Sequence, residues 1–147
     1  MRIVLQRAAS ASVTVDGEVV GAIGPGLVAL IGVAAGDDRA TAERAADQTA
    51  ALRVFPDAEG RFDRSAVDCG AAVLVVSQFT LLADTRKGNR PSFTAAADPA
   101  VAAPLVEAYR DRLAVLGLET ASGRFGAHMD LALVNDGPVT IVLDVTL

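Results

Sequence analysis

Segments with strand-like patterns crowd both ends of the chain, and only two stretches between them have helical spacing. Asp16 and Gly17 stand between β-branched residues, which predicts a hairpin near the N-terminus. Residues 27–33 and 72–77 are continuous apolar runs typical of buried strands. Three further strands are predicted at residues 119–124, 129–134 and 139–145. Both ends of the chain are therefore expected to be mainly β-structure.

The first helical stretch follows the capping residues Asp37 and Asp38 and ends near Arg53. The second covers residues 99–116, and Pro104 leaves open whether it begins at residue 99, begins at this proline, or kinks there. The order of three strands, helix, strand, helix and three strands does not alternate as in a βαβ fold. It predicts one α+β domain over residues 1–147, with mainly antiparallel sheets and two covering helices.

The charge balance argues against an extensive nucleic-acid interface. The net charge is −5 and the sequence pI is about 4.7, whereas phosphate contacts favour a basic protein. Contact with one end of an RNA stays compatible with this composition. The densest positive cluster consists of Arg86, Lys87 and Arg90, and its alternative interpretation is a solvated loop.

The scarcity of cysteine and histidine and the shortness of the apolar runs limit the compartment and the cofactors that we expect. Cys69 is the only cysteine, so no intrachain disulfide is expected. Early charges argue against a signal peptide, and the longest apolar run, residues 26–35, is too short for a membrane helix. We therefore expect a cytoplasmic protein without membrane contact. His128 is the only histidine, so no His/Cys metal cluster is expected, and no cofactor-binding motif is present.

Two short stretches place polar groups beside apolar strands. Residues 77–81, Ser-Gln-Phe-Thr-Leu, end a strand and bring hydroxyls, an amide and backbone N–H groups to the rim of the core. Such groups can stabilise an oxyanion or orient a water, although satisfied hydroxyls at a strand end are an equal alternative. Residues 135–140, Asn-Asp-Gly-Pro-Val-Thr, predict first of all a hairpin turn between two strands.

Together the two stretches resemble the D-aminoacyl-tRNA deacylase family, which carries an S-Q-F-T-L motif and, about sixty residues later, an N-x-G-P-x-T motif. The resemblance covers the whole chain and includes its opening residues 1–7 and the segments 89–93 and 123–129. It implies a β-barrel-like domain with two helices that forms a homodimer with active sites at the interface. The high hydrophobic content of 52% is compatible with such an interface.

The resemblance also implies the reaction, hydrolysis of the ester of D-aminoacyl-tRNA as proofreading in translation. The Gly137–Pro138 motif of one subunit, with a cis bond, would enter the partner's site and reject L-aminoacyl groups. Arg7 would hold this motif, and Met129 would line the site. Arg86, Lys87 and Arg90 would meet phosphates near the 3′ end of the tRNA.

Within the catalytic set of Ser77, Gln78, Phe79 and Thr80, we expect backbone N–H groups from Gln78 to Thr80 to stabilise the oxyanion. Water would attack, helped by the 2′-hydroxyl of the terminal adenosine. Thr80 is the competing nucleophile, but no adjacent base is evident in the sequence.

Two other functions remain open at this point. A related tRNA-editing hydrolase would act on L-amino acids or glycine, and glycyl-tRNA mischarged on tRNA-Ala is a plausible second substrate. Phe79 and Arg7 favour the D-specific branch. An inert β-rich interaction module is the other alternative, and a deacylation assay separates all three.

Overall fold

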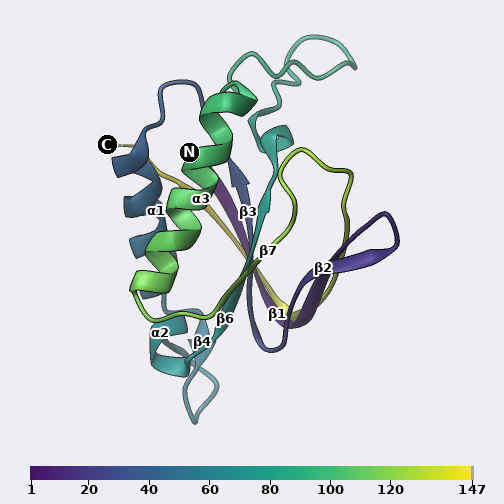
Figure 1. Cartoon of the computed structure of the whole chain (residues 1–147). Coiled ribbons are helices and arrows are strands. Elements are labelled where there is room, and N and C mark those ends of the chain that lie inside the picture. The colour runs from purple at the N-terminus through teal and green to yellow at the C-terminus, as the bar shows by residue number, and fades with distance from the viewer. Residues whose placement is uncertain (147) are drawn as a thin grey trace.

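The computed structural model describes residues 1–146 as a twisted sheet with two long helices on one face (Figure 1). The elements are β1 (Arg2–Val15), β2 (Glu18–Ile23), β3 (Gly26–Gly32), α1 (Arg39–Ala51), β4 (Phe55–Pro56), β5 (Phe62–Arg64), α2 (Ala66–Cys69), β6 (Ala72–Ser77), the 3-10 helix η1 (Phe79–Leu82), α3 (Pro99–Val115), β7 (Thr120–Ser122) and β8 (Asp130–Asp144). No helix within this part of the chain has both the length and the hydropathy to cross a bilayer.

Strand β1 organises the sheet because it pairs on both edges. Along one edge it is antiparallel to β8, from Arg2 opposite Asp144 to Thr14 opposite Asp130. Along the other edge it is antiparallel first to β3 and then to β2. Parallel pairing occurs only where β3 meets β6 and β6 meets β7 among the named strands. The prediction of an α+β fold with mainly antiparallel pairing is confirmed.

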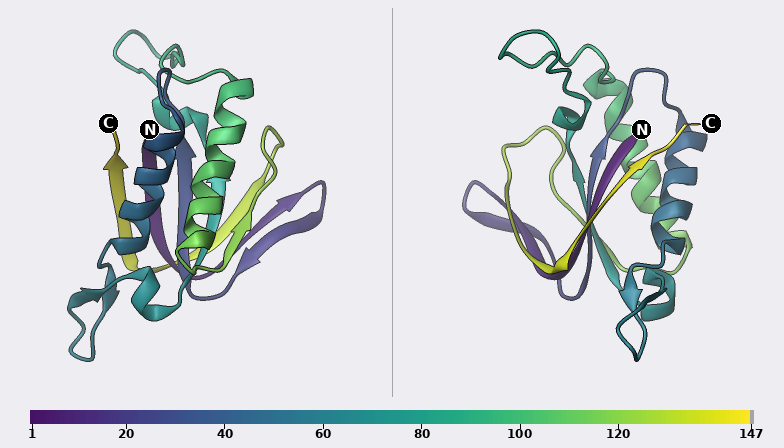
Figure 2. Two further views of the ribbon diagram at one scale, coloured as in Figure 1. Left: turned by 60° about the vertical axis from the view of Figure 1, so that its left-hand side comes forward. Right: turned by 180° about the vertical axis from the view of Figure 1, so that it is seen from behind.

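The sheet curls back on itself and nearly closes. Gly21 of β2 lies so close to the Ser122 carbonyl of β7 that a Cβ at this position would overlap the carbonyl oxygen. The views in Figure 2 show β1 and β2 bending away from the helices and toward the C-terminal strands. This close approach gives the barrel-like form that the family resemblance implied.

Two hydrophobic cores fill the molecule. One lies between the sheet and the helices and contains Ile3, Leu5 and Tyr109. The other fills the curled half of the sheet and contains Val13 and Leu74. Side chains alternate along a strand, so Arg7 follows Ile3 and Leu5 on the same face of β1 and is buried with them.

The two long helices lie close to their predicted positions, whereas two short elements are not predicted. Helix α1 is capped by Asp38, whose carboxylate accepts a hydrogen bond from the Thr41 N–H at 2.9 Å. Helix α3 begins at Pro99 and continues through Pro104, although Asp98 makes no side-chain cap. The sequence patterns did not predict the short β4–β5 hairpin or the short helix α2.

The predicted hairpin turn at residues 135–140 is wrong. Residues on both sides of this segment belong to one strand, β8, and both pair with β1 in the same direction. The chain therefore does not reverse there. The segment is instead a bulge, with Gln6 opposite Thr140 and Ala8 opposite Asn135.

A buried hydroxyl pair joins the two long helices. The Tyr109 hydroxyl on α3 donates to the Thr49 hydroxyl on α1 at 2.8 Å, and Thr49 donates to the Ala45 carbonyl at 2.9 Å. Burial raises the pKa of Tyr109 above the ordinary value of 10.0, and the hydrogen bond with Thr49 opposes this only in part. The neutral phenol is therefore the form that the fold stabilises.

We predict that Tyr109→Phe costs about 1 kcal/mol at neutral pH, because one buried hydrogen bond is lost, whereas Tyr109→Ala costs about 3–5 kcal/mol. Because the folded pKa is raised, the unfolded chain loses the phenolic proton first. Wild-type stability should fall as the pH rises above about 10, by up to about 1.4 kcal/mol per pH unit. Tyr109 is the only tyrosine, so Tyr109→Phe should lack this slope in urea unfolding. Equal slopes in the two proteins would contradict the assignment.

Candidate active site

The first motif, residues 77–81, forms the junction between β6 and η1. Ser77 ends β6 beside Ile31 of β3, and the Gln78 N–H donates to the Ile31 carbonyl at 2.7 Å. Gly32 makes room for η1, because a Cβ there would overlap Leu82 and lie 3.0 Å from the Leu81 Cβ. The start of η1 is thereby fixed against the end of β3.

Fewer backbone N–H groups are available to stabilise an oxyanion than the sequence predicts. The Gln78 N–H already serves the Ile31 carbonyl. A short helix leaves the N–H groups of its first residues without intrahelical partners, and in η1 these residues are Phe79 and Thr80. The predicted set from Gln78 to Thr80 therefore reduces to two backbone donors.

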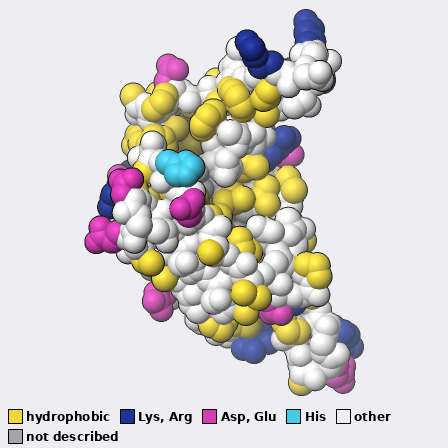
Figure 3. Space-filling view, turned by 90° about the vertical axis from the view of Figure 1, so that its right-hand side faces the viewer, with side chains coloured by type: hydrophobic (Ala, Val, Ile, Leu, Met, Phe, Trp, Pro, Cys, Tyr) yellow, Lys and Arg dark blue, Asp and Glu magenta, His cyan; other side chains and the backbone are white. Residues whose placement is uncertain are grey.

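A cavity of about 580 Å³ opens beside this junction, within the roughly 300–1,000 Å³ usual for small-molecule sites. Its walls come from the ends of β3 and β6, the start of α3, and residues 125–131. The lining is mainly apolar, with Ser77, Gln78, Asp98 and His128 as its polar members. Figure 3 shows hydrophobic side chains gathered on this face around the histidine.

Aromatic rings form part of the cavity wall. The rings of Phe79 and Phe93 meet edge to face with centroids 5.1 Å apart, and Phe79 is 58% exposed. Phe125 and Met129 line the cavity from the wall formed by residues 125–131. The family resemblance covers the segments that hold Phe93 and Phe125 but implies no role for either ring. Their signal in the sequence is weak because each stands alone in a polar loop.

Thr80 differs in position from its motif neighbours. Ser77, Gln78 and Phe79 line the cavity, whereas Thr80 is exposed and does not. Its hydroxyl is hydrogen-bonded to the Gln78 amide. Within residues 1–146, no histidine, lysine or carboxylate is hydrogen-bonded to it. The geometry gives Thr80 no base that would activate it as a nucleophile.

The second motif forms the bulge in β8. Asn135 closes it from within, since its Oδ1 accepts from the Val139 N–H at 2.8 Å and its Nδ2 donates to the Val139 carbonyl at 3.3 Å. The Gly137–Pro138 peptide bond is cis, as predicted. Gly137 has a φ of 133°, and a Cβ there would lie 3.2 Å from Arg7 Nη2. Both the backbone conformation and the space require glycine at this position.

Arg7 ties the bulge to the body of the protein. Its Nε donates to the Asp136 carbonyl at 3.1 Å and lies 3.3 Å from the Asp136 carboxylate. Its Nη1 donates to the Val54 carbonyl at 2.7 Å. Only 8% of Arg7 is exposed. The guanidinium therefore links β1, β8 and the segment that leads into β4.

One chain does not bring its two motifs together. Ile31, beside Ser77, pairs with Ile3 of β1, whereas the bulge lies opposite Arg7. Four residues of strand separate these positions, which is roughly 13 Å along β1. Met129 lines the cavity, whereas Arg7, Gly137 and Pro138 do not.

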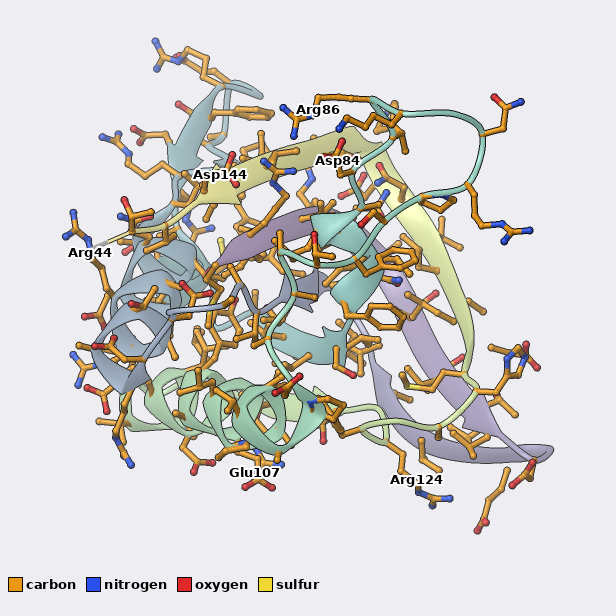
Figure 4. The ribbon with its side chains drawn as sticks, turned by 90° about the horizontal axis from the view of Figure 1, so that it is seen from above. Arg44, Asp84, Arg86, Glu107, Arg124 and Asp144 are labelled. Carbon is orange, nitrogen blue, oxygen red and sulfur yellow. The ribbon has the colours of Figure 1, made fainter. Side chains whose placement is uncertain are left out.

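The positive cluster lies on an exposed loop after η1. The Asp84 carboxylate accepts hydrogen bonds from Arg86 Nε at 2.9 Å and Nη2 at 2.7 Å, and Figure 4 shows the two residues side by side. These bonds lower the pKa of Asp84 and raise that of Arg86. Arg86 is thus paired with a carboxylate that the sequence interpretation left out, while Lys87 and Arg90 are exposed on the same loop.

Comparison with solved structures defines the class of protein. The structure titled "c-Myc DNA Unwinding Element Binding Protein" is 38% identical and matches with a TM-score of 0.91 over 98% of both chains. A structure titled as a probable eukaryotic D-amino acid tRNA deacylase has the same fold, with a TM-score of 0.86 over 97% of both chains at 18% identity. The chain therefore has the fold that these two structures share.

Sequence comparison then identifies the family. The family model described as D-Tyr-tRNA(Tyr) deacylase matches residues 4–144, and the chain belongs to this family of hydrolases that act on aminoacyl-tRNA. D-aminoacyl-tRNA deacylase from Roseiflexus castenholzii is 60% identical over 144 residues, which cover 98% of this chain and 92% of the relative. The Nocardia farcinica deacylase is 58% identical over 147 residues, which cover 98% of this chain and 99% of the relative.

Proposed function

We propose that this deacylase proofreads chirality: it hydrolyses D-aminoacyl-tRNA to free D-amino acid and tRNA, and its Gly137–Pro138 motif excludes L-aminoacyl groups. The observation that carries the proposal is the attachment of the motif through Arg7, which holds the Asp136 carbonyl, and through Asn135, which closes the bulge. The motif therefore presents fixed backbone rather than a mobile side chain. A fixed backbone rejects one enantiomer by steric clash whatever the side chain is.

We infer that a second copy of the chain completes each site. Support comes from the separation of the cavity and the bulge within one chain. Strand β8 also exposes Val134 and Val142, each at 58%, which a partner would cover. In a symmetric dimer the bulge of each subunit would enter the cavity of the other, so that both sites form together.

The reaction we propose uses few ionisable groups. The terminal adenosine would lie against the rings of Phe79 and Phe93, and the N–H groups of Phe79 and Thr80 would stabilise the oxyanion. Water, helped by the 2′-hydroxyl, would attack the ester carbon, and the tetrahedral intermediate would then expel the 3′-oxygen, which takes up a proton. Glycine lacks a side chain to clash, so glycyl-tRNA mischarged on tRNA-Ala would be a second substrate. The proposed place of action is the cytoplasm, where translation would supply such substrates.

Enantioselective hydrolysis is the direct test. We expect kcat/KM for D-tyrosyl-tRNA to exceed that for L-tyrosyl-tRNA by about a thousandfold, which requires only about 4 kcal/mol between the two transition states. Release of amino acid from matched tRNA preparations measures both rates. Equal rates would point to an editing hydrolase without chiral choice, and no hydrolysis of either substrate would point to an interaction module.

Thr80→Ala should keep most of the activity, within about tenfold of wild type, because the Thr80 backbone N–H remains and its hydroxyl has no base. Phe79→Ala is the contrasting variant, since it removes a ring that lines the cavity. Steady-state rates on D-tyrosyl-tRNA compare the two. Complete loss of turnover in Thr80→Ala, together with an aminoacyl ester trapped on Thr80, would establish covalent catalysis instead.

The proposed dimer predicts the mass of the protein in solution. Light scattering at micromolar concentration should give about twice the chain mass of 15.0 kDa. The active fraction should run at this mass, since the isolated chain lacks the motif in its own cavity. An active monomer would refute the shared site.

Charge neutralisation tests the loop. Lys87→Gln and Arg90→Gln should weaken tRNA binding and reduce the slope of log affinity against log salt by about 0.7–0.9 per lost phosphate contact. Arg86→Gln should have a smaller effect, because Asp84 already pairs with Arg86. Enantiomer preference should not change, since phosphate contacts position the substrate. Arg39→Gln on α1 is the matched control, and an unchanged slope in the loop variants would make the cluster a solvated loop.

A further inference from the structure

The β4–β5 hairpin is an exposed arm with no role in the reaction as described so far. It follows α1 and is stiffened from within: the Asp57 N–H donates to the Arg61 carbonyl at 2.8 Å, and Arg53 Nε donates to the Asp63 carbonyl at 2.8 Å. Arg53 also pairs with the Asp63 carboxylate. In Figure 1 the arm lies at the end of the molecule away from η1, beyond the helices. A rigid arm at this place can position groups on β1.

The arm contacts Arg7 in two ways. The Val54 carbonyl, at the start of the arm, accepts a hydrogen bond from Arg7 Nη1 at 2.7 Å. The ring of Phe62, on β5, lies against the guanidinium, with 5.7 Å from Arg7 Cζ to the ring centroid. This separation is within the range for an attractive cation–π contact. Arg7 is therefore held at its edge by hydrogen bonds and on its face by an aromatic ring.

We propose that Phe62 is a positioning residue of the chiral filter, which acts on the Gly137–Pro138 motif through Arg7; the proposal rests on the function proposed above. The ring restricts the guanidinium to the plane in which Nε reaches the Asp136 carbonyl. It also covers one face of the guanidinium and so keeps water from that face. Loss of the ring would let Arg7 tilt and the bulge shift with it.

The exposure of Phe62 separates this role from a role in the core. Phe62 is 55% exposed and belongs to neither hydrophobic core. An aromatic ring left this exposed contributes little burial, whereas its contact with Arg7 is available to no other residue type except tyrosine and tryptophan. The predicted consequence is a change in selectivity with the fold retained.

The experiment compares kcat/KM for D- and L-tyrosyl-tRNA in Phe62→Leu, Phe62→Met and Phe62→Tyr. The ratio of the two values does not depend on the fraction of folded enzyme, because both rates scale with it. We expect the ratio to fall by about two- to fivefold in Phe62→Leu and Phe62→Met, as the strength of exposed cation–π contacts implies, and to be retained in Phe62→Tyr. Val67→Ala, which shortens an exposed side chain on the neighbouring α2, is the control and should leave the ratio unchanged.

A double variant tests that Phe62 acts through Arg7. In an Arg7→Lys background, which removes the planar guanidinium, Phe62→Leu should lower the ratio no further. An additive loss there, or an unchanged ratio in both apolar single variants, would overturn the role of Phe62. A wild-type enzyme that does not distinguish D- from L-tyrosyl-tRNA would instead overturn the proposed chiral filter itself.

Discussion

The antiparallel ladder between β1 and β8 determines where each functional group of the chain lies. The ladder is continuous on both sides of the bulge at Gly137–Pro138, so the bulge cannot move along β1 without breaking backbone hydrogen bonds. On its other edge β1 pairs with β3, and β3 in turn places β6 and Ser77 at the opposite end. The separation of the two motifs is thus built into strand register. A shared site between two copies satisfies this geometry without any change of fold.

The parts of the fold that depend on local pattern could be predicted. The apolar runs at residues 27–33 and 72–77 match β3 and β6 closely, because fully buried strands need no polar alternation. Asp38 caps α1 as its side-chain chemistry suggests. The resemblance placed the cis Gly137–Pro138 bond and the proximity of Arg7, neither of which follows from periodicity.

The parts that depend on distant partners could not be predicted from pattern. Asn-Asp-Gly-Pro is a local turn signature, but β1 holds the chain on both sides of it and converts the expected hairpin into a bulge. From the sequence alone the Gln78 N–H is a candidate oxyanion donor. In the fold it already donates to the Ile31 carbonyl of β3. Likewise, Phe93 and Phe125 become cavity residues only when η1, α3 and the loop before β8 are brought together.

Charge is buried at two places in residues 1–146: at Arg7 beside the bulge, and at the N-terminal ammonium of Met1, which pairs with Asp37 at 2.8 Å. Among residues 1–146, Arg7 is the only charged side chain that is buried. Burying a guanidinium costs free energy unless its donors are satisfied, and replacing such a group by an apolar one is often neutral or stabilising. Stability alone therefore does not account for Arg7. Its partners are the carbonyls of Asp136 and Val54, which lie in two segments far from Arg7 and from each other in the sequence. A planar group with several fixed donors orients two such backbone segments at once, which neither an apolar side chain nor a flexible ammonium does equally well. The burial of Arg7 is thus best explained by the precision with which it holds the bulge.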